Sequence, residues 1–326
     1  MRGRRVGVVF RAAAPLAAFL LALSFACAPV AGTLPGRPTA DIKKTGEERA
    51  EEGPKAVVTK PVESGRNASE NAPEGKSRLD RSIEGFTREI SADPRRAETY
   101  NDRGFAYAKK NQYDLAVADY NKALELNPRF DAAYYNRGNA FYQQGLYDLA
   151  IADYTKALGY NPKHDRAFNN RGNSYYQTGR YDQAIADYAR ALEVNPNYDA
   201  TYYNLANAHY QKGDYGRAIA EYTRAVERNP RSDRAYNNRA AAFILANRLV
   251  DAEHDINKAL ELNPEDGSIM VRMAELYAAK KDVVEACRWL KKGVEKGYAD
   301  QRYLKTSTTF DNIRRFPCFD DILARR

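Results

Sequence analysis

Apolar and small residues recur at helical spacing along most of this chain. Phe168, Gly172 and Tyr175 lie three to four positions apart, which is the spacing of one face of an α-helix. A break at Thr178-Gly179 separates this stretch from a second one of the same spacing. The pattern therefore predicts a pair of antiparallel helices, each of about 13 residues.

The same pattern returns at a fixed interval. Prolines mark it, each 34 residues after the last, at positions 94, 128, 162, 196, 230 and 264. A period of this length indicates one supersecondary unit copied in series, whose function lies on a stacked surface rather than in a single pocket. Each Asn-Pro pair is expected to end a helix, because the residue before a proline avoids the α region. Aspartates at the start of the copies predict helix N-caps, at Asp131, Asp165, Asp199 and Asp233.

Small residues at matching places in the two helices predict a close approach between them. Large side chains at these places would hold the helices apart. The first helices carry Gly104, Gly138 and Gly172, and these are expected to face Ala116, Ala150 and Ala184 in the second helices.

The repeated pattern resembles the tetratricopeptide repeat, a helix–turn–helix unit with an aromatic residue, a glycine, a tyrosine, two alanines and a closing proline at set places. Copies four and five replace the glycine with Ala206 and Ala240. The resemblance implies an all-α superhelical solenoid, in which the first helices line a concave face. Residues 95–266 hold five such copies, which begin at Ala97, Asp131, Asp165, Asp199 and Asp233.

The segments on either side of the five copies fit the ends of such an array. Residues 78–94 are expected to form a helix that caps copy one. Residues 267–326 are expected to form a degenerate sixth copy and a C-terminal cap. Terminal copies are atypical because their outer faces have no neighbour to bury them.

The N-terminal residues differ from the rest in composition. Residues 1–32 have a basic start followed by an uncharged run rich in Ala and Leu, which predicts an export signal. Lipidation at Cys27 and an uncleaved membrane anchor are the alternatives. Residues 33–77 lack aromatic residues and are rich in charges, which predicts a disordered linker. We therefore expect a protein exported to the periplasm or secreted.

Charge and cysteine content narrow the set of partners. The formal net charge is +8, and the four arginines of residues 1–32 account for half of it. Elsewhere acidic and basic residues are interspersed, which argues against a nucleic-acid partner. Membrane contact is expected only through the N-terminal segment. Cys287 and Cys318 either pair, as in an oxidising compartment, or remain buried thiols.

The sequence contains no recognisable catalytic pattern. Its three histidines fall at different phases of the repeat, and no group of Cys and His residues has metal-ligand spacing. A phosphate-binding loop and a nucleophile elbow are also missing. We therefore expect no enzyme, no cofactor and no metal.

Polar residues recur on the first helices in two registers. The ladder position holds Asp102, Asn136, Asn170, Asn204, Asn238 and Arg272. Three residues further along come Asn139, Asn173 and Asn207, and the residue before the ladder alternates between Asn and Tyr, as at Tyr135, Asn169 and Tyr203. An asparagine side chain both donates and accepts, so a ladder can hold the peptide groups of an extended chain, with tyrosines adding contact area. Alternatively, the asparagines bond the next helix within the stack.

A second polar pair is expected to be structural. Arginine replaces the leucine usual in the family at Arg103, Arg137, Arg171 and Arg239, and each copy concerned has an aspartate sixteen residues on, at Asp119, Asp153, Asp187 and Asp255. Copy four has Leu205 and Glu221 instead. Because the two residue types come and go together, we predict an ion pair between the helices of each copy.

These observations predict an exported scaffold that binds another protein, through an extended peptide in the concave groove formed by the first helices. One alternative is a solenoid that self-associates end to end. Another is a non-catalytic subunit of an envelope glycan-processing complex. The identity of the partner depends on a few side chains and is not fixed by the fold.

Overall fold

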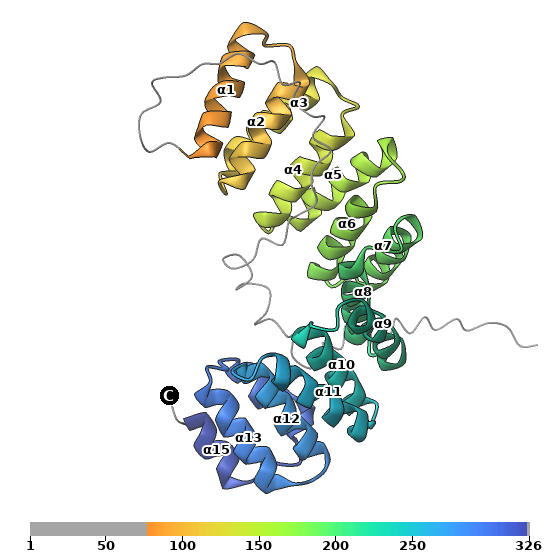
Figure 1. Ribbon diagram of the computed structural model, residues 1–326, viewed down its shortest axis with the longest axis vertical. Coiled ribbons are helices and arrows are strands. Elements are labelled where there is room, and N and C mark those ends of the chain that lie inside the picture. Colours follow the sequence, from red (N-terminus) through yellow and green to blue (C-terminus); the bar gives the residue numbers. More distant parts are fainter. Residues whose placement is uncertain (1–76, 325–326) are drawn as a thin grey trace, which may run out of the picture. The chain divides into compact units, whose positions relative to one another are not determined.

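The computed structural model describes residues 77–324, and every regular element in this range is helical (Figure 1). The first helices of the six copies are α2 (Ala97–Lys109), α4 (Asp131–Gln143), α6 (Asp165–Gln177), α8 (Asp199–Gln211), α10 (Asp233–Leu245) and α12 (Gly267–Ala279). The second helices are α3 (Tyr113–Leu126), α5 (Tyr147–Tyr160), α7 (Tyr181–Val194), α9 (Tyr215–Arg228), α11 (Leu249–Leu262) and α13 (Val283–Glu295). The predicted all-α repeat fold is confirmed.

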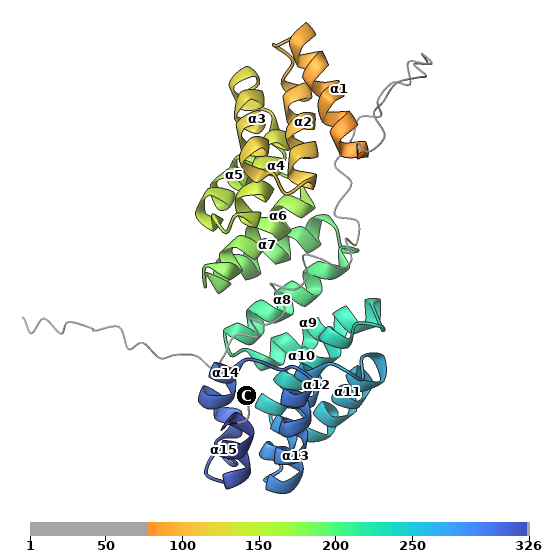
Figure 2. The ribbon, with the colours of Figure 1, turned by 90° about the vertical axis from the view of Figure 1, so that its left-hand side faces the viewer.

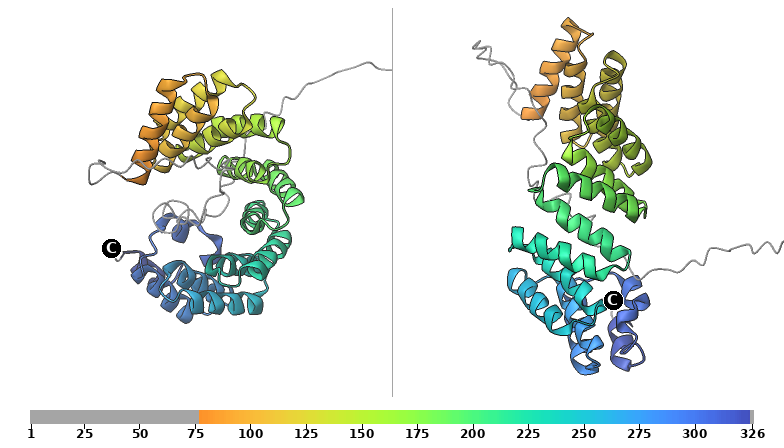
Figure 3. Two further views of the ribbon diagram at one scale, coloured as in Figure 1. Left: turned by 45° about the horizontal axis from the view of Figure 1, so that its top comes forward. Right: turned by 90° about the vertical axis from the view of Figure 1, so that its right-hand side faces the viewer.

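Each first helix packs against the second helix of its own copy, and each second helix packs against the first helix of the next copy (Figures 2 and 3). The first helices of neighbouring copies also contact one another. They therefore form one continuous surface, which we call the first-helix face.

The glycines of the first helices allow a close approach, as predicted, and a tyrosine contributes to it as well as the facing alanine. A Cβ atom on Gly104 would lie 2.8 Å from Cε1 of Tyr120 and 3.1 Å from the backbone oxygen of Ala116. A Cβ atom on Gly172 would lie 2.8 Å from Cε1 of Tyr188, and one on Gly138 would lie 2.9 Å from Cε1 of Tyr154. The facing alanines are fully buried nearby. A tyrosine ring therefore fills the space above each glycine, because the flat ring needs a neighbour without a side chain.

The aspartates predicted as N-caps lie one position inside their helices. Asp131, for example, is the first residue of α4, and Phe130 is at the cap. Its carboxylate accepts a hydrogen bond from Nδ2 of Asn161 at 3.1 Å, and Asp165 and Asp233 bond Asn195 and Asn263 in the same way. The N-cap prediction was wrong: in these copies the aspartate ties the start of the first helix to the Asn-Pro pair that ends the second.

The predicted arginine–aspartate pairs are present in all four copies. Arg171 donates from Nε and Nη2 to the two oxygens of Asp187, both at 2.7 Å. Its Nη1 donates to Oγ1 of Thr155 in the preceding copy at 3.0 Å. The aspartates are nearly buried, with side chains 1–8% exposed. Such two-pronged bonds to a buried carboxylate hold three helices in register.

The ends of the array are closed by additional helices. Helix α1 (Arg78–Ala92) packs on α2 and begins with a capping box between Ser77 and Asp80. At the other end α14 (Gln301–Thr306), the 3₁₀ helix η2 (Thr308–Phe310) and α15 (Pro317–Ala324) follow copy six. We call residues 300–324 the tail.

The tail shares a core with copy six. Leu290, Phe310 and Ile313 are completely buried in one cluster. A disulfide joins Cys287 of α13 to Cys318 of α15, so pairing, rather than free thiols, is what the structure shows. No helix within residues 77–324 is both long enough and apolar enough to span a membrane.

Candidate functional site

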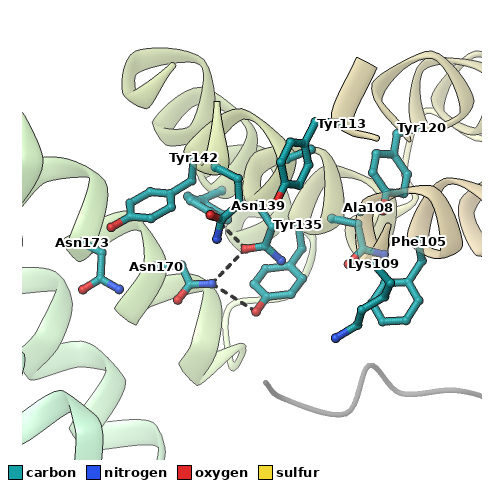
Figure 4. A pocket seen from close by; sticks show the side chains of 14 residues that line it. Phe105, Ala108, Lys109, Tyr113, Tyr120, Tyr135, Asn139, Tyr142, Asn170 and Asn173 are labelled. Atoms are coloured by element: carbon teal, nitrogen blue, oxygen red, sulfur yellow. Dashed lines mark hydrogen bonds between the residues drawn. The ribbon is translucent and has the colours of Figure 1, made fainter. Parts of the chain in front are cut away.

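The first-helix face contains a pocket of about 380 Å³ over copies one to three (Figure 4). Helices α2, α4 and α6 supply most of its wall, and five tyrosine rings and five side-chain amides make up much of the lining. The lining residues are Phe105, Ala108, Lys109, Tyr113, Tyr120, Tyr135, Asn136, Asn139, Ala140, Tyr142, Gln143, Tyr154, Asn170 and Asn173. The sequence therefore identified Tyr135, Asn136, Asn139, Asn170 and Asn173 correctly as neighbours on one surface.

The ladder asparagines use their amide hydrogens within the stack. Nδ2 of Asn170 donates to the hydroxyl of Tyr135 at 3.2 Å and to Oδ1 of Asn139 at 2.9 Å (Figure 4). Both acceptors belong to the preceding copy. Asn204 and Asn238 repeat the arrangement one and two copies further on, with partners Asn169, Asn173, Tyr203 and Asn207. The donors of the ladder thus hold neighbouring copies together.

This network explains why asparagine and tyrosine alternate before the ladder position. Nδ2 of Asn136 donates to Oδ1 of Asn101 at 2.9 Å, whereas Asn238 donates to the hydroxyl of Tyr203 at 2.8 Å. An amide oxygen and a phenol oxygen are both acceptors. The two residue types therefore perform the same structural task.

The second register of asparagines is bonded on its oxygen. Oδ1 of Asn173 accepts from the hydroxyl of Tyr188 at 2.8 Å as well as from Asn204. Asn139 and Asn207 have the equivalent bonds from Tyr154 and Tyr222. The alternative interpretation of the asparagines, as part of the scaffold, is thus correct for at least one half of each of these side chains. It holds for both halves of Asn170, whose Oδ1 accepts from Nδ2 of Asn169 at 3.2 Å.

The other half of several amides is still available. Among the described residues, Oδ1 of Asn136, Oδ1 of Asn204 and Nδ2 of Asn173 have no hydrogen-bond partner, and none of them is fully enclosed. These atoms offer acceptors and a donor on one surface. Such a set matches the alternating N–H and C=O groups of an extended chain.

The pocket is nearly uncharged. Burial raises the pKa of the Tyr135 phenol to about 12 and raises the pKa of Tyr154 well above its usual value, so both rings are neutral at physiological pH. Lys109 is the only charged side chain in the lining, and its Nζ lies 5.3 Å from the centre of the Phe105 ring. The lining therefore consists mainly of amides and aromatic rings and has a single side chain that could form an ion pair.

The two ends of the ladder differ from its middle. Asp102, in copy one, is exposed and accepts from Nδ2 of Asn101 at 3.3 Å. Arg272, in copy six, pairs through Nη1 with Glu275, which is completely buried. The tail adds further donors to that carboxylate, from the hydroxyls of Tyr303 and Thr309. The ladder is therefore covered by the chain's own tail at copy six.

Several lining residues were missed by the sequence reading. Phe105, Lys109, Tyr142 and Gln143 all belong to the pocket. A signal for some of them was present, because tyrosine recurs at positions 142, 176 and 210, always followed by glutamine. Glu275 was also missed, since it occurs in one copy only and no repeat marks it. Within residues 77–324 no group of three potential metal ligands occurs.

Stacked helix pairs with a continuous first-helix face define an α-helical repeat protein of the kind that presents a surface to partners. Family models described as "TPR repeat" match residues 104–145, 138–179 and 172–213, and a further model described as "Tetratricopeptide repeat" matches residues 203–257. The chain is a tetratricopeptide-repeat protein, a class that serves as scaffolds for interactions between proteins. No curated protein matches it.

Solved structures share the fold at low sequence identity. YrrB, described as a TPR protein with an unusual peptide-binding site, is 23% identical with a TM-score of 0.53, covering 58% of this chain and 97% of its own. The C-terminal part of a TPR protein from Cytophaga hutchinsonii is 20% identical with a TM-score of 0.56, covering 70% and 93%. A TPR protein from Parabacteroides merdae is 20% identical with a TM-score of 0.53, covering 72% and 92%.

Proposed function

We propose that this protein is an exported scaffold that binds an extended segment of another protein across the first-helix face of copies one to four. The observation that carries the proposal is the set of amide atoms without a partner among the described residues, Oδ1 of Asn136, Oδ1 of Asn204 and Nδ2 of Asn173, in and next to the 380 Å³ pocket. A peptide backbone supplies the N–H and C=O groups that pair with them, and the tyrosine rings provide contact area at small entropic cost. YrrB, a TPR protein with an unusual peptide-binding site, shares this fold and points in the same direction.

Two further features support the details of this proposal. The disulfide between Cys287 and Cys318 is in keeping with export, because such bonds persist in oxidising compartments. The export signal itself, residues 1–32, and the linker, residues 33–77, lie almost wholly outside the described residues. Mass spectrometry of the protein from its native source tests the export signal. An intact N-terminus contradicts signal cleavage. A lipid on Cys27 indicates that the exported protein is anchored to a membrane.

The groove is tested with a substitution that leaves the scaffold bonds in place. Asn173→Asp keeps Oδ1, which accepts from Tyr188 and Asn204, and removes the unpaired Nδ2 donor. Asn121→Asp is the matched control, since Asn121 lies on α3 and uses its Oδ1 to accept from Arg137 at 2.6 Å. The full chain and both variants serve as baits for affinity capture from the native cell envelope.

We expect the wild type and Asn121→Asp to recover the same partner and Asn173→Asp to recover about tenfold less, the effect of one lost hydrogen bond in a closed interface. Circular dichroism checks that all three baits are equally folded. Equal recovery by all three contradicts binding at the first-helix face. Recovery of only the bait's own chain favours self-association.

A further inference from the structure

Helix α1 takes the place of a second helix at the start of the array. Asp80 of α1 accepts a hydrogen bond from Nζ of Lys110, 30 residues further on. Asp114 of α3 accepts in the same way from Nε2 of Gln144, also 30 residues further on. Thr87 accepts from the arginine of the helix that follows, as threonines of the second helices do. Helix α1 therefore packs on α2 as each second helix packs on the next first helix.

This equivalence places the start of α1 at the rim of the pocket. Ser77 precedes Asn111 by one period of 34 residues, so it corresponds to the turn that joins the two helices of a copy. It is also held near such a turn. Ser77 caps α1 by accepting from the backbone N–H of Asp80 at 3.1 Å, and Asp80 bonds Lys110 in the turn between α2 and α3. The residues on either side of that turn, Lys109 and Tyr113, line the pocket (Figure 4).

The sequence before Ser77 contains one stretch with the properties that the pocket requires. Residues 33–76 have only five large aliphatic side chains, and three of them are Val57, Val58 and Val62. Valine and threonine favour an extended backbone, and the residue before Pro61 avoids the α region. Residues 56–59 read Ala-Val-Val-Thr. They offer consecutive N–H and C=O groups with uncharged side chains to a lining that is itself nearly uncharged.

The lining has polar atoms that such a backbone can pair with. Oδ1 of Asn136 and Nδ2 of Asn173 both belong to pocket residues, and neither atom has a hydrogen-bond partner among the described residues. One is an acceptor and the other a donor. An extended chain presents both kinds of group in alternation, and its valine side chains supply apolar area for the tyrosine rings.

The stretch is close enough to the pocket to reach it. Fourteen residues, 63–76, lie between Val62 and Ser77, and a connection of that length spans at most about 50 Å. A short connection gives an effective concentration on the order of 1 mM. The other end of the array already uses its own chain in this way, because the tail covers copy six with Tyr303 and Thr309.

We propose that residues 56–62 bind as an extended segment in the pocket of copies one to three of their own chain, where they compete with the partner. This inference rests on the proposed function, because it names the regulation of the site assigned to that partner. At an effective concentration of about 1 mM, a segment with a dissociation constant of about 0.1 mM weakens a competing ligand about tenfold. Only partners that displace the segment are then bound.

The test uses an acetylated and amidated peptide of residues 55–62 as the probe and calorimetry on the full chain. Val57→Asp/Val58→Asp places two carboxylates in the segment and is expected to empty the pocket. Leu34→Asp/Ile42→Asp is the matched control, because it adds the same charge elsewhere in residues 33–76. Neither variant changes a residue of the helical array. We expect Val57→Asp/Val58→Asp to bind the probe about tenfold more tightly than the wild type and the control.

The side-chain amide of Asn173 reports whether the pocket is filled. Its ¹⁵N NMR resonance is expected at the same position in the wild type and in Leu34→Asp/Ile42→Asp, and at a different position in Val57→Asp/Val58→Asp. Saturation of that variant with the probe is expected to return the resonance to the wild-type position. An Asn173 resonance that is the same in all three proteins overturns the proposal.

Two further results of the calorimetry also overturn it. One is equal affinity of the wild type and Val57→Asp/Val58→Asp for the probe, which includes the absence of binding to either. The other is a wild-type affinity that rises when the protein is diluted, because a contact within one chain does not depend on protein concentration. That result assigns the segment to the pocket of a second copy.

Affinity capture distinguishes failure of this inference from failure of the proposed function. Val57→Asp/Val58→Asp as bait is expected to recover about tenfold more partner than the wild type. If the two baits recover the same amount and Asn173→Asp recovers less, the inference is overturned and the proposed function stands. If Asn173→Asp recovers as much as the wild type although the probe competes as expected, the pocket holds only the chain's own segment, and the proposed function fails.

Discussion

The first-helix face has two sections, which carry different residues at the ladder position and at the position three residues further along. In copies one to four it is lined by asparagines and tyrosines, is nearly uncharged, and has a pocket beside amide atoms that have no partner among the described residues. In copy six the same register holds Arg272 and Glu275, and the tail lies over them. On the first-helix face itself, the asparagines and tyrosines of the first section bond one another through neutral groups. In copy six the corresponding residues form a buried ion pair, and an apolar core and a disulfide lie beside it.

The difference fits the proposed function, in which copies one to four bind a peptide and copy six closes the end of the array. A surface that recognises a backbone needs polar atoms with spare bonding capacity, and neutral amides tolerate partial pairing at modest cost. A terminal copy needs stability, because it has only one neighbour to pack against. The tail supplies the missing neighbour for copy six, and it covers part of the first-helix face in doing so.

The strongest test of this comparison removes the buried carboxylate. Glu275→Ala leaves Arg272 charged and without its only partner, so we expect the free energy of unfolding to fall by about 3–5 kcal/mol. Asp102→Ala, at the exposed end of the ladder, is the control and is expected to change it by less than about 0.5 kcal/mol. Urea unfolding followed by the fluorescence of Trp289, the only tryptophan, measures both. Equal effects of the two substitutions on the free energy of unfolding would contradict the idea that a buried ion pair stabilises copy six but not copy one.

The disulfide gives the next largest effect. Cys287 and Cys318 are 31 residues apart in the sequence, and closing a loop of that length stabilises a protein by about 2–4 kcal/mol. We expect Cys287→Ser/Cys318→Ser to lower the free energy of unfolding by that amount. Urea unfolding followed by the fluorescence of Trp289 measures it. Hydrogen exchange of α2 to α7 is expected to be unchanged, because each copy contacts only its neighbours. Faster exchange in those helices would mean that the two sections unfold as one.

Alkaline pH is expected to act mainly on the first section. Burial raises the pKa of Tyr135 to about 12 and raises the pKa values of Tyr154, Tyr188 and Tyr222 well above their usual value. A raised pKa in the folded state contributes stability that is complete below the unfolded value near pH 10 and is lost as pH rises through the folded value. The loss is about 1.4 kcal/mol per pH unit for each such tyrosine.

Copies five and six have Ile256 and Leu290 in place of these tyrosines. The titration uses Tyr303→Phe, because burial also raises the pKa of Tyr303 in the tail. Tyrosinate absorbance and Trp289 fluorescence are recorded together between pH 10 and 12. Trp289 fluorescence that changes before the absorbance contradicts the expectation.

The fold could be predicted from the sequence because the same residue pattern occurs in each of several copies. Arginine and aspartate appear and disappear together across copies, which predicted the ion pairs between Arg171 and Asp187 and their equivalents. The N-caps were predicted wrongly because periodicity does not fix a helix boundary to one residue, and because the Asn-Pro asparagines compete for the same carboxylates.

The site was only half predictable, for a physical reason. The sequence showed which residues lie on the first-helix face, but not which way each amide is turned. Oδ1 of Asn173 is bonded and its Nδ2 is not, and that depends on contacts with α7 and α8. The burial of Arg272 depends on Tyr303, about 30 residues later in the sequence, in a segment without a repeat to compare. Contacts made once, far along the chain, leave no periodic signal.

The smallest expected effect tests whether the asparagine network is structural at all. Tyr188→Phe removes the hydroxyl that donates to Oδ1 of Asn173 at 2.8 Å and leaves that buried oxygen with Asn204 alone. We expect a loss of about 1 kcal/mol. Tyr181→Phe is the control: this ring lies edge-on to Tyr176 with centroids 5.5 Å apart, and its variant is expected to stay within about 0.5 kcal/mol of wild type.

Thermal unfolding of both variants measures the difference, and peptide affinity is measured beside it. If Tyr188→Phe costs no stability and Asn173→Asp still weakens binding about tenfold, Asn173 serves the ligand only and its bond to Tyr188 is incidental. If Tyr188→Phe lowers both stability and affinity, the scaffold bond on Oδ1 is what aims Nδ2 at the ligand. The second outcome is the one expected, because an amide fixed on one side presents its other side in one orientation.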